Sequence, residues 1–150
     1  MNTSEIKREN LINLYNEKGE RHGYWESYWS NGQLWYKGNY VNGNEHGYWE
    51  EYFPDGQLSC KGNYVDGKLH GYWEFYYSNG QLSSKKNYVD GKRHGYWEDY
   101  CSNGQLSYKC YYDMGEQVDY NPDEPKVIEL TLTDIANKLG IDVDKLRIKE

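Results

Sequence analysis

Four histidines at equal spacing are the first residues of the sequence that could do chemistry. Each opens the phrase H-G-Y-W-E, and 24 residues separate one from the next: His22, His46, His70 and His94. A row of imidazoles could bind a metal ion or respond to pH. If each phrase begins a new hairpin, successive rings lie about 9–10 Å apart, at ~4.8 Å per strand. One zinc ion, with bonds of about 2.0–2.1 Å, cannot join them. We therefore expect no metal, no cofactor and a structural role in which each ring caps the preceding loop. Contact with a partner or a response to pH is the alternative.

The carboxylates and thiols give little support to catalysis. A glutamate ends each phrase, at Glu26, Glu50, Glu74 and Glu98. The carboxyl pairs of glycosidases lie about 5–5.5 Å or about 6.5–9.5 Å apart, so successive glutamates fall near the upper limit, but each has a lysine predicted opposite. The three cysteines lack metal-ligand spacing, and we expect buried, reduced thiols at Cys60, Cys101 and Cys110. No glycine-rich phosphate-binding motif occurs. The sequence therefore predicts a protein without enzymatic activity.

The period of 24 predicts a row of β-hairpins that positions these side chains. Each unit has a strand-forming phrase G-Y-W-E-x-Y, an Asn-Gly or Asp-Gly pair, a second strand Q-L-x-x-K-x-N-Y-V and a second turn. Asn-Gly and Asp-Gly favour two-residue type I′ turns, because both central residues need positive φ. With such a turn at residues 31–32, Glu26 faces Lys37, and Trp25 faces Gly38 with its indole over the glycine.

The aromatic residues divide into an expected core and an expected surface. Four tryptophans and four leucines at the period of 24 are predicted to form the core: Trp25, Trp49, Trp73, Trp97, Leu34, Leu58, Leu82 and Leu106. Because Glu51 and Asp99 would share the tryptophan face, a bulge in the first strand is an alternative.

Ten other aromatic residues are candidates for binding a partner. The tyrosines among them are expected on one face beside the glutamates, where they stack across strands, contact a partner, or do both. Two extra tryptophans of the first hairpin form a further local patch. The candidates are Tyr24, Tyr28, Trp29, Trp35, Tyr48, Tyr52, Tyr72, Tyr76, Tyr96 and Tyr100.

Composition narrows the function further. The chain has 150 residues, a net charge of −7 and 17% aromatic residues, among them 18 tyrosines and 6 tryptophans. This aromatic content argues against disorder. The acidic balance argues against binding to nucleic acid and to anionic lipid, so no nucleic-acid or membrane partner is expected. No apolar run reaches the ~20 residues of a membrane span, and no signal peptide is apparent. We expect a cytoplasmic protein.

The repeats define the expected domain organisation. Residues 1–21 form an N-terminal segment with a partial capping repeat, 22–117 four repeats, and 118–126 a linker containing N-P-D-E-P. Residues 127–150 are predicted to form a strand-helix-strand appendage that caps the sheet, with Thr133 capping the helix and Leu132 in the first strand. This segment also resembles the start of a helix-turn-helix, but Asp142 and Asp144 would repel phosphate.

The repeats resemble MORN repeats of the bacterial variant typical of YwqK-type antitoxins. The shared pattern is G-x-W-x-x-Y-x-x-N-G-x-L followed by Y-x-x-G, carried here by Gly23, Trp25, Tyr28, Asn31, Gly32, Leu34, Tyr40 and Gly43 and their copies. The resemblance implies a mainly β fold, an elongated, single-sheet antiparallel meander of hairpin repeats. Residues 127–150 add the small α/β C-terminal cap expected above.

The same resemblance implies a non-enzymatic binding scaffold. We expect an antitoxin or inhibitor, bacterial or from a phage, that sequesters another protein through its aromatic sheet face. The partner would be a basic toxin or a host enzyme, since the chain is acidic. Two alternatives remain open at this point. One is a small-molecule or nucleotide binder that uses stacked aromatics, and the other is a structural, self-assembling repeat scaffold.

Overall fold

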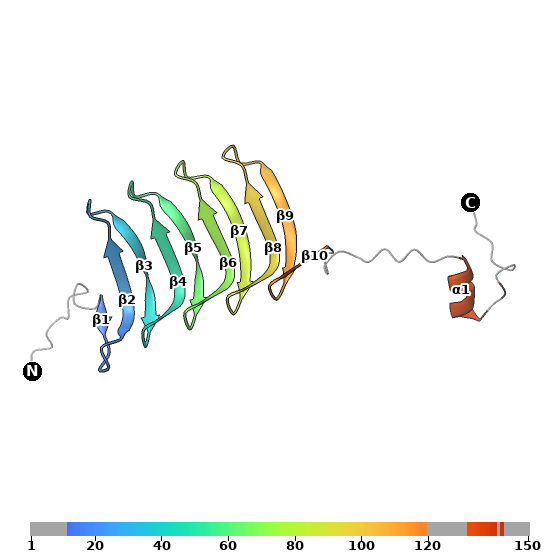
Figure 1. Ribbon diagram of the computed structural model, residues 1–150, viewed down its shortest axis with the longest axis horizontal. Helices are drawn as coiled ribbons and strands as arrows, with labels where there is room; N and C mark the ends of the chain where they lie inside the picture. The colour runs from blue at the N-terminus through green and yellow to red at the C-terminus, as the bar shows by residue number, and fades with distance from the viewer. Residues whose placement is uncertain (1–11, 120–131, 141, 143–150) are drawn as a thin grey trace, which may run out of the picture. The chain divides into compact units, whose positions relative to one another are not determined.

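The computed structural model describes residues 12–119, 132–140 and 142. Residues 12–119 form one antiparallel sheet of ten strands, which follow one another in chain order as a row of hairpins (Figure 1). The predicted mainly β, single-sheet meander is therefore confirmed. The strands are β1 (Leu14–Tyr15), β2 (Arg21–Tyr28), β3 (Leu34–Val41), β4 (Asn44–Tyr52), β5 (Leu58–Val65), β6 (Lys68–Tyr76), β7 (Leu82–Val89), β8 (Lys92–Tyr100), β9 (Leu106–Asp113) and β10 (Glu116–Val118).

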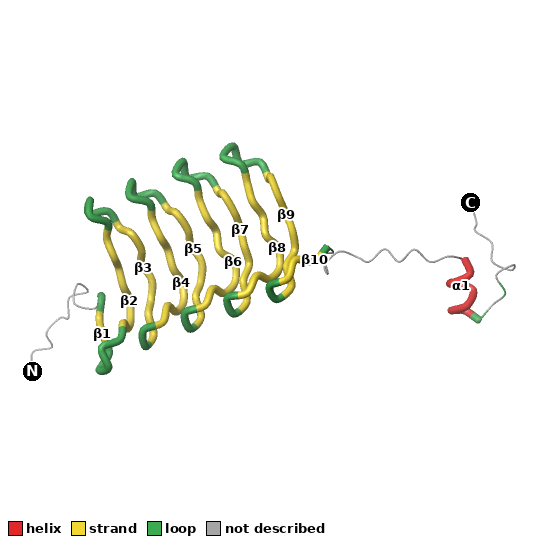
Figure 2. The backbone as a smooth tube through the Cα atoms, in the orientation of Figure 1, coloured by secondary structure: helices red, strands yellow, loops and turns green. Residues whose placement is uncertain are grey.

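The turns at the two ends of the strands differ in geometry (Figure 2). At one end, the Gln33 carbonyl accepts the Trp29 N–H at 2.8 Å, and the Trp29 carbonyl accepts the Gly32 N–H at 2.9 Å. Three residues therefore form the loop, a type I turn closed by left-handed Gly32 (φ 84°), and the predicted two-residue turn is wrong. At the other end, Asn42 and Gly43 have φ values of 49° and 84°, as the predicted type I′ turn requires.

A bulge restores the predicted register of the strands. Tyr28 pairs with Leu34, but Ser27 pairs with Tyr36, so Trp35 is an extra residue on β3. The three-residue turn moves the pairing by one residue, and the bulge moves it back. The predicted pairing of each glutamate with a lysine across the hairpin is therefore confirmed in all four repeats.

The same bulge changes the face on which the leucines lie. Leu34 pairs directly with Tyr28, and directly opposed residues of an antiparallel pair share a face. Leu34, Leu58 and Leu82 are half-buried, and Leu106 is 52% exposed. The prediction that these leucines belong to the core is therefore wrong, because it assumed uninterrupted alternation along β3.

A second bulge contains the glycine of each His-Gly pair from β4 onward. Between β3 and β4, Gly38 pairs with Trp49 and Tyr40 pairs with Glu45, so three residues of β4 face one residue of β3. Gly47 lies in this bulge with φ of 82°, and a Cβ added there would meet nothing within 4 Å. The glycine is thus required for its backbone conformation rather than for space.

The hydrophobic core lies on one face of the sheet. The predicted tryptophans are buried: Trp25, Trp49, Trp73 and Trp97 are exposed by 7%, 4%, 2% and 8%. Their rings alternate edge-to-face with tyrosines, at centroid distances of 5.8 Å (Trp25–Tyr40), 5.4 Å (Tyr40–Trp49), 5.6 Å (Trp49–Tyr64) and 4.9 Å (Tyr64–Trp73). This aromatic row takes the place that a second layer has in other sheet proteins.

Two indoles of the row lie over glycines of the preceding hairpin. A Cβ on Gly38 would come 2.0 Å from Cε3 of Trp49, and a Cβ on Gly62 would come 2.3 Å from Cδ2 of Trp73. The indole over Gly38 is therefore that of Trp49 and not, as predicted, that of Trp25. The contact joins successive repeats, because Trp49 and Trp73 belong to the following hairpins.

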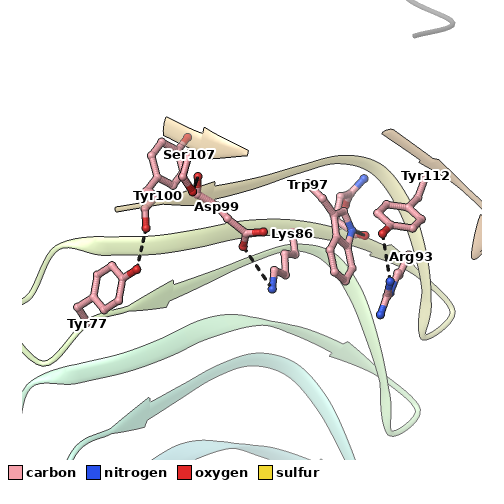
Figure 3. A network of polar contacts seen from close by, with 9 residues as sticks. Tyr77, Lys86, Arg93, Trp97, Asp99, Tyr100, Ser107 and Tyr112 are labelled. Carbon is pink, nitrogen blue, oxygen red and sulfur yellow. Dashed lines mark hydrogen bonds and ion pairs between the residues drawn. The ribbon is translucent and has the colours of Figure 1, made fainter. Parts of the chain in front are cut away.

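Two acidic side chains also lie on the tryptophan face. Glu51 accepts the Trp49 Nε1–H at 3.2 Å. In the third hairpin Lys86 replaces the glycine, and its ammonium lies 5.0 Å from the Trp97 ring and 3.6 Å from Asp99 (Figure 3). The bulge expected in the first strand of the hairpin comes after Glu51 and Asp99. Both side chains therefore stay on the tryptophan face, where they bond to polar groups.

Side chains at the three-residue turns join the hairpins in pairs. Trp29 Nε1–H donates to the Tyr52 carbonyl at 3.0 Å, and Asn31 Nδ2–H donates to the Pro54 carbonyl at 2.7 Å, which joins the first hairpin to the second. The third and fourth hairpins are joined in the same way, through Tyr77 to Tyr100 at 2.7 Å (Figure 3) and Asn79 to Ser102 at 3.4 Å.

The second and third hairpins lack this link. Phe53 and Asp55 occupy the places of Trp29 and Asn31, and neither a phenyl ring nor an ionised carboxylate has a hydrogen to donate. Within residues 12–119, no side-chain hydrogen bond connects these two turns.

The second unit of the chain, Tyr120–Glu150, contains α1 (Leu132–Leu139). Asp134 in its first turn and Lys138 in its last complement the helix dipole, and Gly140 follows with φ of 65°. Thr133, expected to cap the helix, lies inside it. Leu132, expected in a strand, is the first residue of the helix. The other residues of the two expected strands lie outside the described residues, and Val118, expected in the linker, ends β10.

Candidate functional site

Each hairpin presents a glutamate between two tyrosines on the face opposite the tryptophans. In the first hairpin, the Tyr24 hydroxyl donates to Glu26 Oε1 at 2.8 Å, and the Tyr28 hydroxyl donates to Oε2. We call each such set a tyrosine clamp. The four clamps and the lysines beside them form the tyrosine face: Tyr24, Glu26, Tyr28, Tyr48, Glu50, Tyr52, Tyr72, Glu74, Tyr76, Tyr96, Glu98, Tyr100, Lys37, Lys61, Lys85 and Lys109.

The tyrosine face is open to solvent. Tyr28, Tyr48 and Tyr72 are 53%, 50% and 51% exposed, and the other clamp tyrosines are half-buried. The eight tyrosines expected on one face beside the glutamates therefore share that face. Six of the eight hydroxyl groups donate to the clamp carboxylates, all but those of Tyr72 and Tyr96, so these six rings have defined positions before any partner arrives.

The two extra tryptophans of the first hairpin lie apart from this face. The rings of Trp29 and Trp35 are 5.1 Å apart, and Trp35 contacts Tyr36 at 5.3 Å, which in turn stacks on Trp49. They therefore extend the tryptophan row toward the turn. The ten candidate residues do not form a single surface, because the bulge at Trp35 brings it to the tryptophan side.

Two of the four lysines form ion pairs with the glutamate of the following hairpin. Lys37 Nζ lies 2.7 Å from Glu50 Oε2, and Lys61 Nζ lies 3.0 Å from Glu74 Oε2. Each ammonium also lies 5.6 Å from the ring centroid of a tyrosine in the same clamp. Sequence reasoning found these lysines but paired them within their own hairpins, and only Lys109 pairs in that way, 3.0 Å from Glu98.

Comparison with known protein families decides the identity of the repeats. A family model described as a MORN repeat variant matches residues 21–42, 45–66, 69–90 and 93–114. The chain belongs to the MORN repeat variant family. The matched segments coincide with the four hairpin repeats and share their period of 24. MORN repeats are in general non-catalytic modules that often bind proteins or membranes. No curated protein matches the chain.

In the MORN array the pKa values of three clamp glutamates are lowered and those of six clamp tyrosines are raised. Burial raises the pKa of Glu50, but hydrogen bonds from Lys37, Tyr52 and Tyr48 outweigh it, so the pKa is lowered. Burial, together with the hydrogen bond to Glu26, raises the pKa of Tyr24 to about 12. At neutral pH these three glutamates are therefore charged and these six tyrosines are neutral.

Acid is expected to weaken the MORN array by protonating the clamps. The pKa values of Glu50, Glu74 and Glu98 are lowered in the folded chain. Their stabilisation is therefore complete above the unfolded-state pKa of about 4.3 and is lost as the pH falls through the lower folded-state pKa. Urea unfolding at about pH 6 and about pH 3 should show a larger loss for the wild type than for the triple Glu→Gln variant at these positions. Equal losses would contradict this, because the two proteins share every other carboxyl group.

The histidines of the MORN array contact the following turn rather than the preceding one. The Nδ1 atoms of three of them lie 3.3 to 3.7 Å from aspartates in the type I′ turns or, for Asp113, directly before one: His46–Asp66, His70–Asp90 and His94–Asp113. In the first repeat the turn residue is Asn42. The structural role expected for these histidines thus involves another loop. Among the described residues, no group of three or more His, Cys, Asp or Glu side chains could hold a metal ion.

The three thiols of the MORN array are free and differ in exposure. Cys60 is buried among the core aromatics, where burial and the nearby Glu51 raise the pKa of its thiol to about 12. Cys110 is half-buried, whereas Cys101 is exposed at a three-residue turn. The expectation of three buried thiols is therefore wrong for Cys101.

No described helix is long and apolar enough to cross a membrane.

Proposed function

We propose that this MORN array is a non-enzymatic scaffold that sequesters a basic protein through its tyrosine face. The observation that carries the proposal is the exposure of Tyr28, Tyr48 and Tyr72, each about half open to solvent on one face. Tyrosine is enriched in the energetically dominant parts of protein interfaces, because it offers a large contact area with few rotatable bonds. The hydrogen bonds to glutamate reduce the entropy lost on binding further.

Charge indicates the kind of partner. The chain has a net charge of −7, and the clamps place carboxylates between the exposed rings. The tyrosine face itself carries four glutamates and four lysines, so it is the net charge of the whole chain that steers positively charged partners toward it and disfavours acidic ones. A basic toxin or a host enzyme with a basic active-site surface would be blocked by occlusion, which is how an antitoxin or a phage inhibitor of this design would act.

The test compares two sets of exposed tyrosines. The triple variant Tyr28→Ser, Tyr48→Ser, Tyr72→Ser should remove at least about 90% of the partner captured by tagged wild-type protein, since truncating even one hot-spot residue costs about 2 kcal/mol or more. Serine at Tyr15, Tyr77 and Tyr108, which are 63%, 36% and 48% exposed outside the tyrosine face, should leave capture unchanged. Quantitative mass spectrometry of captured proteins measures both. Equal losses in the two variants, or a collapse of thermal stability in the first, would contradict the proposal.

A further inference from the structure

The glutamate of the first clamp differs from the other three in its partners. Glu50, Glu74 and Glu98 each pair with a lysine at 2.7 to 3.0 Å. Glu26 accepts only the two tyrosine hydroxyls of its clamp on its carboxylate, and within the described residues no lysine, arginine or histidine lies within 4 Å of it. The ladder of ion pairs therefore leaves out its first carboxylate.

The offset of the lysines explains this difference. Lys37 is in register with both Glu26 and Glu50, and its single ammonium binds Glu50 at 2.7 Å. Lys37 and Lys61 each precede the glutamate they bind by 13 residues, and the residue at that distance before Glu26 is Asn13. The Asn13 side chain accepts the Glu26 backbone N–H at 2.8 Å. The Asn13 side chain therefore bonds to the strand backbone and brings no cation to the clamp.

We infer that the first clamp, Tyr24, Glu26 and Tyr28, receives a lysine side chain of the basic partner protein. The protein itself shows the binding mode twice, because Lys37 and Lys61 occupy the second and third clamps with their ammonium groups against the carboxylate and near a ring. The inference rests on the proposed function and adds a specific anchoring contact to it.

The first clamp is suited to this occupant. Tyr28 is 53% exposed, so an ammonium group can approach from solvent. A carboxylate has about four lone-pair sites, and the two hydroxyls leave some of them free for a charged donor. An entering lysine gains a charge-assisted hydrogen bond and the attraction of an aromatic face. Because the hydroxyls already orient the carboxylate, little rearrangement opposes binding.

An oligolysine peptide tests the inference with the full-length protein. Calorimetric titration is carried out at about 0.05 M salt, where charge interactions are weakly screened. Oligolysine should bind to the wild-type protein, and the same peptide with acetylated lysines should not. Glu26→Gln should weaken oligolysine binding about tenfold, the loss of one charge-assisted contact. Glu98→Gln removes the same charge from the clamp that Lys109 already occupies, and should change the affinity by less than about twofold.

The outcomes separate this inference from the proposed function. Equal weakening by Glu26→Gln and Glu98→Gln would show that only net charge matters and would overturn the inference, as would absence of binding to the wild type. A captured partner that binds wild type and Glu26→Gln equally would also overturn it, while the proposed role of the tyrosine face would stand. Loss of oligolysine binding in Glu26→Gln with no captured partner would support the clamp and contradict the proposed function.

Discussion

Replacing Trp73 by alanine is expected to destabilise the protein by about 3–5 kcal/mol, the range for removing a buried aromatic side chain. Trp73 is 2% exposed, lies over Gly62, packs edge-on against Tyr64 at 4.9 Å and donates its Nε1–H to the Asn63 carbonyl at 3.0 Å. Within residues 12–119 the sheet is a single layer, so no second layer of this unit can move in to fill the cavity. Since small proteins are stable by only about 5–15 kcal/mol, this is a large share of the total, and the urea midpoint of unfolding should fall markedly.

Trp35→Ala is the matched control for this prediction. It removes the same side chain from a position that is 42% exposed, and exposed substitutions usually cost less than about 1 kcal/mol. Circular dichroism in urea gives both values. Similar losses for the two variants would mean that the tryptophan row is not the source of stability.

Replacing Gly38 by alanine is expected to cost about 1–3 kcal/mol, although it adds a single methyl group. The new Cβ would lie 2.0 Å from Cε3 of Trp49. The indole has little room to move, because it is 4% exposed, stacks on Tyr36 at 5.0 Å and meets Tyr64 edge-on at 5.6 Å. The clash therefore strains the row of rings that joins the first hairpin to the second.

Two further variants isolate this clash. Lys86→Ala changes the equivalent position of the third hairpin, where the protein already accommodates a Cβ, and should cost less than about 1 kcal/mol. In a Trp49→Ala background, Gly38→Ala should cost close to nothing in stability, because the indole that clashes with the new methyl group is absent. The effects of the two substitutions are therefore not additive. A full cost in that background would assign the effect to the backbone instead.

The sequence was sufficient to predict the hairpins and the tryptophan core, because both depend on local patterns repeated four times. It was not sufficient for the turns. Asn31-Gly32 and Asn42-Gly43 are the same dipeptide, yet the first belongs to a three-residue loop and the second to a type I′ turn. The correct pairing of glutamates with lysines resulted from two deviations that cancel, the longer turn and the bulge at Trp35.

The candidate site was predicted in part for a related reason. Alternation along β2 was enough to group the tyrosines around the glutamates, since no bulge interrupts Tyr24 to Glu26. Register could not decide which glutamate Lys37 binds, because the lysine is directly opposite one on each side. That choice depends on side-chain packing between hairpins, which a one-dimensional pattern does not contain. The distinct environment of Glu26 follows from the same choice.

The missing link between the turns of the second and third hairpins gives the sheet uneven stiffness. The backbone ladder between β5 and β6 is intact, so the sheet stays whole there. On either side of this line, Trp29 and Tyr77 fasten neighbouring turns to each other, whereas Phe53 cannot. The array should therefore deform as two stiffer plates that meet along one softer line, which lets the tyrosine face adjust its curvature at its midpoint while each half keeps its shape.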